Sequence, residues 1–285
     1  GLVQRQNTTG ATSATVSGLA GSTRYSYVVS ALSAAGEGDT SVALNQSTSP
    51  ALVTNVTSSH QSTSSITLKW AAPAVPSAGT AGAAVQGYKV YRRVVHELND
   101  VVGSSGTSQA VLSHFFDSAH KDLVVDSLVY DGSNSTNTSV ALGGLTGGVL
   151  YQYVVGAVSA AGEGFRSAAA SVSTSPAAPT VLRSVSHTTS SVVLEWAAPV
   201  SKTGAGVSGY VVYRNDGAGG AVTTVAYDGR GSTATNGTVS GLSGGLTYVF
   251  AVSAFSAGGE GDRTATVRVS TAPGVSASMS SVAQT

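Results

Sequence analysis

The residues with the clearest capacity for chemistry are histidines and acids gathered in one segment of this 285-residue chain. Between about 94 and 123 lie His96, His114 and His120, with Asp117 and Asp122 nearby. Imidazole and carboxylate groups bind transition metals when they converge on one point. His114 and Asp117 are three residues apart, which suits one face of a helix, but solvated loop histidines are the simpler interpretation. We therefore expect no metal site and no cofactor.

Acidic residues outside that segment recur at one place in the sequence. Glu37, Glu163 and Glu260 each stand in the same Gly-Glu-Gly turn. Carboxylate catalysis needs a pair of acids flanking a cleft, whereas a residue that recurs in every copy of a turn indicates turn chemistry or a rim contact. Cysteine, a phosphate-binding loop and a Gly-x-Ser-x-Gly motif are all missing from the sequence. We predict that the chain is not an enzyme and has no catalytic residues.

Asparagine occurs mostly in Asn-x-Ser/Thr sequons, which account for six of the eight asparagines. In a secreted eukaryotic protein this motif accepts an N-linked glycan. The alternative is unmodified asparagine in turns rich in Ser and Thr. We predict covalent glycans at Asn7, Asn45, Asn55, Asn134, Asn137 and Asn236.

Composition limits the classes of partner. Charged residues are only 10% of the chain and the formal net charge is zero, so a basic face for nucleic acid is not expected. No apolar run approaches the length of a membrane-spanning helix, and no signal segment opens the sequence. Valine is frequent and glycine occurs 35 times, which is typical of strands joined by turns.

Three segments repeat without gaps and place the Gly-Glu-Gly turn after a strand. In each, a leucine precedes a tyrosine by six residues: Leu19 and Tyr25, Leu145 and Tyr151, Leu242 and Tyr248. Large apolar residues then alternate with period 2. This pattern predicts a strand with one face in a core, followed by a hairpin.

A second block occurs twice. Alternating strands end at Trp70 and Trp196, each followed by a proline that stops the strand. Gly-Tyr-x-Val-Tyr strands then begin at Gly87 and Gly209. These two blocks supply further strands before each Leu-Tyr segment.

Together these motifs resemble the fibronectin type III family, over nearly all of the chain except one insertion. The resemblance implies an all-β fold of tandem immunoglobulin-like sandwiches with fibronectin type III topology. It also implies that Trp70 and Trp196 fill the space between sheets. Tyr25, Tyr151 and Tyr248 would be corner tyrosines whose hydroxyls bond to backbone a few residues upstream.

Joints that contain a proline divide the chain into unequal modules. We predict a partial module at 1–49 without its first three strands, complete modules at 50–175 and 176–272, and the first strand of a further module at 273–285. We expect a window from a longer array; the alternative is that a neighbouring chain completes the first module. Short proline-bearing joints predict a stiff rod.

The first complete module carries an insertion at about 94–123. A long insertion on a regular scaffold is a favoured place for a special contact. We predict a contact loop there formed by His114, Phe115 and Phe116, which would pack within the loop or against a neighbouring strand.

The leading hypothesis is a non-catalytic structural component of a glycosylated extracellular or cell-surface rod or filament. Its partners would be like modules or copies of itself. Two alternatives are an adhesion or receptor-type binding array, and spacer modules of a larger secreted enzyme.

Overall fold

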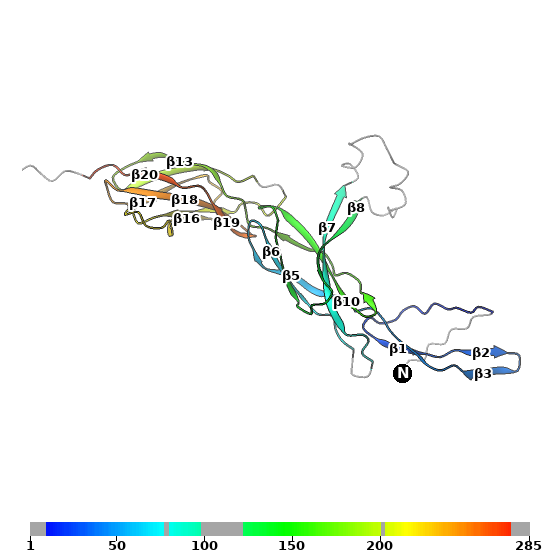
Figure 1. The fold of residues 1–285 in the computed structure, drawn as a ribbon. Coiled ribbons are helices and arrows are strands. Elements are labelled where there is room, and N and C mark those ends of the chain that lie inside the picture. Colours follow the sequence, from blue (N-terminus) through cyan, green and yellow to red (C-terminus); the bar gives the residue numbers. More distant parts are fainter. Residues whose placement is uncertain (1–9, 77–79, 98–121, 201–202, 275–285) are drawn as a thin grey trace, which may run out of the picture. The chain divides into compact units, whose positions relative to one another are not determined.

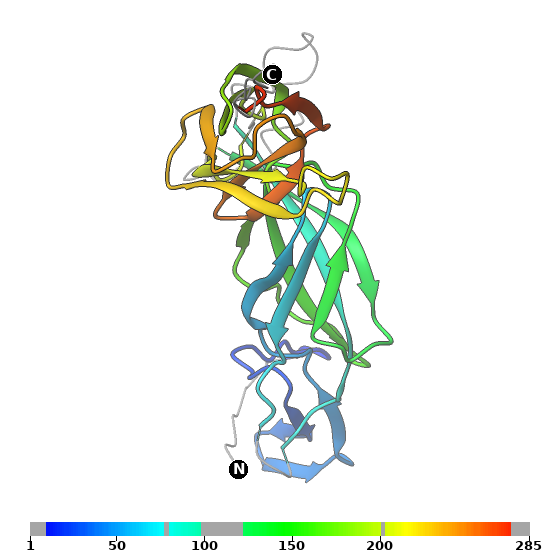
Figure 2. The ribbon, with the colours of Figure 1, turned by 90° about the vertical axis from the view of Figure 1, so that its left-hand side faces the viewer.

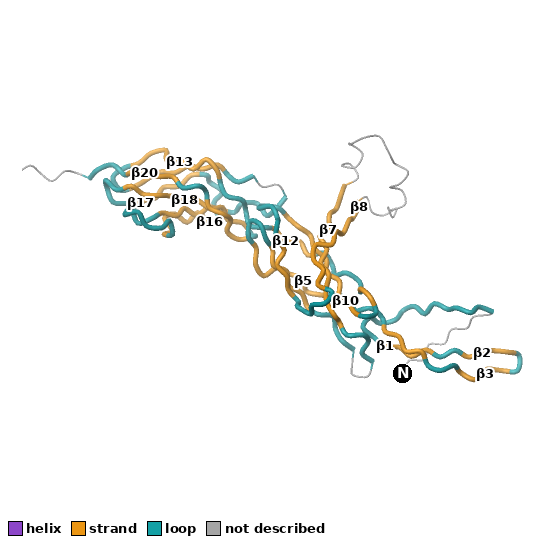
Figure 3. Tube along the Cα trace, in the orientation of Figure 1, coloured by secondary structure: helices purple, strands orange, loops and turns teal. Residues whose placement is uncertain are grey.

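The computed structural model describes residues 10–76, 80–97, 122–200 and 203–274. All elements in these residues are strands, and Figure 3 accordingly draws only strands and loops along the described trace. No described helix could cross a membrane. The all-β prediction is confirmed. The chain divides into two compact units, of which the first holds 1–57, 68–140 and 152–170 and the second holds the rest.

The partial first module consists of two short strand pairs. They are β1 (Arg24–Tyr27) with β4 (Leu44–Ser47), and β2 (Ser30–Ser33) with β3 (Gly36–Thr40). No strand precedes β1 in the described residues. Val29 is 73% exposed, whereas its counterparts Val155 and Val252 are fully buried.

The second module contains a five-stranded and a three-stranded sheet. The larger has the order β11 (Gly162–Glu163), β10 (Leu150–Ser159), β7 (Val85–Glu97) and β8 (Asp122–Gly132), with β12 (Ala170–Ser173) also paired to β10. The smaller has the order β5 (Thr54–Gln61), β6 (Ile66–Ala71) and β9 (Ser139–Leu142). The ring centroids of Trp70 and Tyr88 lie 5.3 Å apart.

The hairpin of β7 and β8 is much longer than its counterpart in the third module. The two strands stay in antiparallel register out to Glu97 opposite Asp122, and Figures 1 and 2 show them alongside one another in cyan and green. Both ends of the predicted insertion are thus paired strand. Residues 98–121, including the predicted contact loop of His114, Phe115 and Phe116, lie outside the described residues.

The third module repeats the two-sheet pattern. Its larger sheet has the order β16 (Thr224–Arg230), β15 (Gly209–Arg214), β18 (Thr247–Ser256) and β19 (Gly259–Arg263), with β20 (Val267–Ser270) on β18. Its smaller sheet has the order β13 (Thr180–His187), β14 (Ser191–Ala197) and β17 (Asn236–Ser240). Trp196 is buried in the core beside Tyr210, with ring centroids 5.3 Å apart. Burial of apolar side chains of this size contributes about 2–3 kcal/mol each.

The central strands β10 and β18 are buried on both faces, which the alternating sequence pattern did not predict. Val154 and Ala251 point away from the core, yet both are buried. Val154 lies directly opposite Tyr91, and Ala251 directly opposite Tyr213. Directly opposed residues share one face of a sheet, so these tyrosines cover the outer face. The predicted core face of each strand is confirmed, since Phe250, Val252 and Ala254 lie in the core; the covering of the second face was not predicted.

The first strand of each complete module contains a residue with left-handed backbone. Asn55 has φ 52° and Val181 has φ 56°, each five residues after a joint proline. The pairing of β13 with β14 shifts register at this point, as in a β-bulge. Asparagine tolerates this conformation, whereas in a β-branched residue it is strained.

Replacing Val181 by asparagine should therefore raise the free energy of unfolding of the third module by about 1 kcal/mol. Val181 is 70% exposed, so little apolar burial is lost. Denaturant unfolding followed by Trp196 fluorescence in a Trp70→Phe background measures the change. Val185→Asn, at an exposed valine of the same strand without positive φ, is the matched control. Equal effects of the two substitutions would contradict the strain argument.

Candidate functional site

The structure places the predicted core residues inside the sandwiches. Trp70, Trp196 and Leu242 are buried, and Leu19 and Leu145 are half-buried. The Trp70 ring lies against Tyr88, and the Trp196 ring lies against Tyr210, in each case a tyrosine of the next strand along the chain. These residues therefore form packing contacts in the core.

All three corner tyrosines receive a backbone hydrogen bond from five residues upstream. The hydroxyl of Tyr25 accepts from the N–H of Ala20 at 2.9 Å. The hydroxyls of Tyr151 and Tyr248 accept from Thr146 at 2.9 Å and Ser243 at 3.0 Å. Each bond anchors the loop before its strand, which is the geometry that the family resemblance implies.

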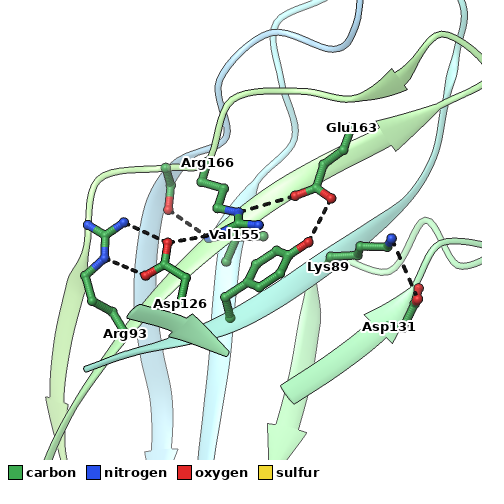
Figure 4. A network of polar contacts seen from close by, with 9 residues as sticks. Lys89, Arg93, Asp126, Asp131, Val155, Glu163 and Arg166 are labelled. Atoms are coloured by element: carbon green, nitrogen blue, oxygen red, sulfur yellow. Dashed lines mark hydrogen bonds and ion pairs between the residues drawn. The ribbon is translucent and has the colours of Figure 1, made fainter. Parts of the chain in front are cut away.

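A network of ionisable side chains covers the outer face of the larger sheet in the second module (Figure 4). The Tyr91 hydroxyl donates to Glu163 Oε2 at 2.7 Å. The Arg166 guanidinium lies over the Tyr91 ring, 3.5 Å from its centroid, and its Nε contacts Glu163 Oε1 at 3.4 Å. We call Tyr91, Glu163 and Arg166 the clasp of this module.

Asp126, on β8, extends the network at the far side of Arg166. Arg93 donates to both carboxylate oxygens of Asp126, at 2.8 and 2.9 Å, and Arg166 donates to Oδ2 at 3.0 Å. The Asp126 side chain is only 12% exposed. Hydrogen bonds from Arg93, then from Arg166, outweigh the effect of burial and lower the pKa of Asp126.

The third module repeats the clasp with Tyr213, Glu260 and Arg263. Tyr213 donates to Glu260 Oε1 at 2.6 Å, and the Arg263 guanidinium lies 3.4 Å from the centroid of the Tyr213 ring. Ser253 donates a further 2.6 Å bond to Glu260. Burial, followed by the hydrogen bond to the acid, raises the pKa of both Tyr91 and Tyr213. A tyrosine held protonated in this way is a hydrogen-bond donor rather than a base.

The partial first module has only part of this arrangement. The hydroxyl of Ser30 bonds to Glu37 Oε1 at 2.5 Å, as Ser253 does to Glu260. Thr40 stands where the other modules have Arg166 and Arg263.

The Gly-Glu-Gly turn is also shaped by close backbone contact. A Cβ on Gly164 would lie 2.2 Å from the carbonyl oxygen of Pro50, and one on Gly261 would lie 2.0 Å from that of Pro176. Only glycine fits at Gly164 and Gly261, because the backbone of the joint proline passes so close to the turn. The repeated turn therefore holds the start of the first strand and presents the glutamate of the clasp.

The predicted glycosylation sites that the structure describes are all exposed: Asn45, Asn55, Asn134, Asn137 and Asn236. Asn7 lies outside the described residues. In the described part of the chain, no group of three His, Asp or Glu side chains could hold a metal ion. His114 and His120 lie outside that part.

Sequence reasoning singled out the turn glutamates but missed their partners. The spacing held a signal, because an arginine follows three residues after Glu163 and after Glu260 but not after Glu37. The second tyrosine of each Gly-Tyr-x-Val-Tyr strand is the other partner. No sequence pattern pointed to Asp126, since its contact with Arg93 depends on the register of β7 and β8.

Asp126→Asn should destabilise the second module by about 2 kcal/mol at neutral pH, because two guanidinium groups lose a charged acceptor. Since the folded pKa of Asp126 lies below its unfolded value near 3.9, its contribution is fully present above that value. The contribution is lost as pH falls through the folded pKa. The difference between wild type and variant, read by Trp70 fluorescence in a Trp196→Phe background, should shrink below about pH 4.

Asp228→Asn, read by Trp196 fluorescence in a Trp70→Phe background, is the control for that experiment, because the exposed Asp228 pairs with the Arg230 guanidinium at 3.6 Å and accepts the Arg230 backbone N–H at 3.1 Å. Exposed pairs contribute little. A pH-independent effect of Asp126→Asn would contradict the role given to its carboxylate.

Arg263→Lys should lower the unfolding free energy of the third module by about 0.5–1 kcal/mol, although charge is conserved. Lysine cannot reproduce the planar stacking on Tyr213. Trp196 fluorescence in a Trp70→Phe background reports the loss. Arg268→Lys, on β20 of the same sheet, is the control and should leave the unfolding free energy of the third module unchanged. An unchanged unfolding free energy in Arg263→Lys would refute the stacking contribution.

Comparison with known proteins agrees with this geometry. The family model of the fibronectin type III domain matches residues 50–173 and 177–270. Chitinase A1 of Niallia circulans is 37% identical over 169 residues, covering 52% of this chain and 22% of that protein. Exoglucanase B of Cellulomonas fimi is 31% identical over 241 residues, covering 78% of this chain and 19% of that protein.

The chain thus spans about a fifth of the length of these two relatives. Among solved structures, the FN1–FN3 domains of chicken CNTN1 align with 16% identity and a TM-score of 0.40, covering 89% of this chain and 79% of that one. The two module matches together include well over half of the sequence. The chain belongs to the fibronectin type III family and contains tandem modules of it.

Proposed function

We propose that this chain is a non-catalytic structural component of an extracellular or cell-surface protein, built by repeating β-sandwich modules. The observation that supports this most is the clasp. Its ionisable side chains contact one another, and the same three residue types recur in the next complete module. Groups that recur and pair in this way serve the stability of each module rather than one substrate.

The charged groups beside the clasp are also engaged. Asp126 is shared between Arg93 and Arg166 and is nearly buried. A general base must have a free lone pair and a pKa near the working pH. Asp126 has a lowered pKa and two guanidinium partners, so it does not meet the second requirement and proton transfer is not its role.

The extracellular location is supported by the two relatives, whose names describe enzymes acting on chitin and on glucan. The module matches lie in a minor part of each relative's length. This favours a second candidate, in which the modules are spacers of a larger secreted polysaccharide-degrading enzyme. In both candidate functions the modules themselves have no catalytic activity. The two candidates differ in whether a catalytic domain is attached to the modules.

The purified chain should release no soluble sugar from chitin or cellulose. Its rate should equal that of a Glu163→Gln, Glu260→Gln variant, which removes the glutamates of the Gly-Glu-Gly turns in both complete modules. Reducing-sugar assays on both polymers provide the measurement. Activity that the double variant lacks would overturn the non-catalytic proposal.

Electron microscopy of the native material, isolated with an antibody to residues 177–270, separates the two candidates. Regular polymers are expected for a filament component. Single particles that carry chitin- or glucan-hydrolysing activity would support the spacer instead. Monodisperse particles without such activity would contradict both and favour a receptor or adhesin.

A further inference from the structure

We infer that the two complete modules carry N-linked glycans on the side of their three-stranded sheets, and that their five-stranded sheets remain free of N-linked sugar. The inference rests on the proposed extracellular location, because sequons are read only in the secretory pathway. The inference also says which side of each module carries sugar. The sequence alone does not show this, since the sequons are scattered along the chain.

The sequons of the complete modules are fully accessible in the fold. Asn55, Asn134, Asn137 and Asn236 are all exposed, and so are the hydroxyl residues two positions later, Thr57, Thr136, Ser139 and Thr238. Attached sugar would therefore enter solvent without displacing packed side chains.

Two of these sequons lie on the smaller sheets, and the other two lie between the sheets of the second module. Asn55 lies on β5 and Asn236 lies on β17, both strands of three-stranded sheets. Asn134 and Asn137 lie in the connection from β8 to β9, and Thr138 at its end already accepts a backbone bond from Trp70 at 3.0 Å. No sequon falls on a described strand of either five-stranded sheet.

The orientation of Asn236 is set by the alternation of β17. Gly237 and Val239 are buried toward the core, whereas Asn236 and Thr238 are exposed on the other face. Asn236 lies opposite Glu195, whose carboxylate contacts Arg183 at 2.8 Å. A glycan on Asn236 would therefore extend from a polar outer face.

Asn55 has a second structural reason to be asparagine. Its left-handed φ of 52° is the conformation that strains Val181 at the same place in the third module. β5 is an edge of its sheet, and an edge strand exposes unpaired backbone groups to other chains. A glycan at Asn55 would shield that edge.

Of the other described asparagines, Asn215 fits this division and Asn45 does not. Asn215, beside the five-stranded sheet of the third module, is buried, accepts backbone bonds from Gly217 and Val249, and is not in a sequon. Asn45 of the partial module differs, because it lies on β4, the counterpart of β12 and β20. The inference therefore concerns only the modules with two sheets.

The experiment is expression of the full chain in a eukaryotic secretory host. Peptide mass spectrometry after peptide-N-glycosidase treatment reads each occupied asparagine as aspartate. Occupancy is expected at Asn55, at Asn236 and at one or both of Asn134 and Asn137. Thr57→Ala and Thr238→Ala should each remove one glycan from the intact mass, whereas the matched Thr57→Ser and Thr238→Ser should retain it.

Hydroxyl-radical footprinting before and after deglycosylation tests the sidedness. Removal of sugar should increase labelling of Thr57, Lys69 and Thr238 on the smaller sheets. Labelling of Val124 and Val225, on β8 and β16, should not change. Increased labelling of Val124 and Val225 would overturn the sidedness.

Chain that reaches the medium without sugar at Asn55, Asn134, Asn137 and Asn236 would overturn the glycan inference while leaving the proposed location intact. Chain that carries sugar at these sites but is never released or displayed would instead contradict the proposed location.

Discussion

Each complete module depends on covering both faces of one central strand, β10 or β18. The inner face is covered by the apolar core around Trp70 or Trp196. The outer face is covered by a tyrosine of the neighbouring strand, which is held flat beneath an arginine. A chain without cysteine has no disulfide to restrain its unfolded state, so a domain of this size must gain stability by burial.

The Gly-Glu-Gly turn connects this covering layer to the rest of the module. Its glutamate fixes the tyrosine hydroxyl, and its last glycine lets the entering chain pass within van der Waals distance. The described part of residues 1–49 has no such layer. It has the glutamate, but it lacks the arginine and the Gly-Tyr-x-Val-Tyr strand, and Val28 and Val29 of its strand are largely exposed.

The proposed function rests on how the clasp residues of the two complete modules are engaged. In the described residues, the tyrosine, glutamate and arginine of each clasp are held by one another, so they stabilise the modules. The smaller sheets expose polar residues and the sequons of Asn55 and Asn236. Sugar on that side and a self-contained network on the other would make each module soluble and chemically inert, as a repeated structural unit needs to be.

The sequence by itself determined the family, the repeated strands and the core, because apolar periodicity, Trp-x-x-Pro and the Leu-Tyr corner are local patterns. It also identified the turn glutamates and the sequons as residue types. Only the tertiary structure decided what these residues contact. The folded chain brings Tyr91, Asp126 and Arg166 together from distant segments, and the division into two sheets places Asn55 and Asn236 on the smaller sheets. Neither pairing nor sidedness is encoded locally, since both depend on which strands become neighbours after the chain has folded.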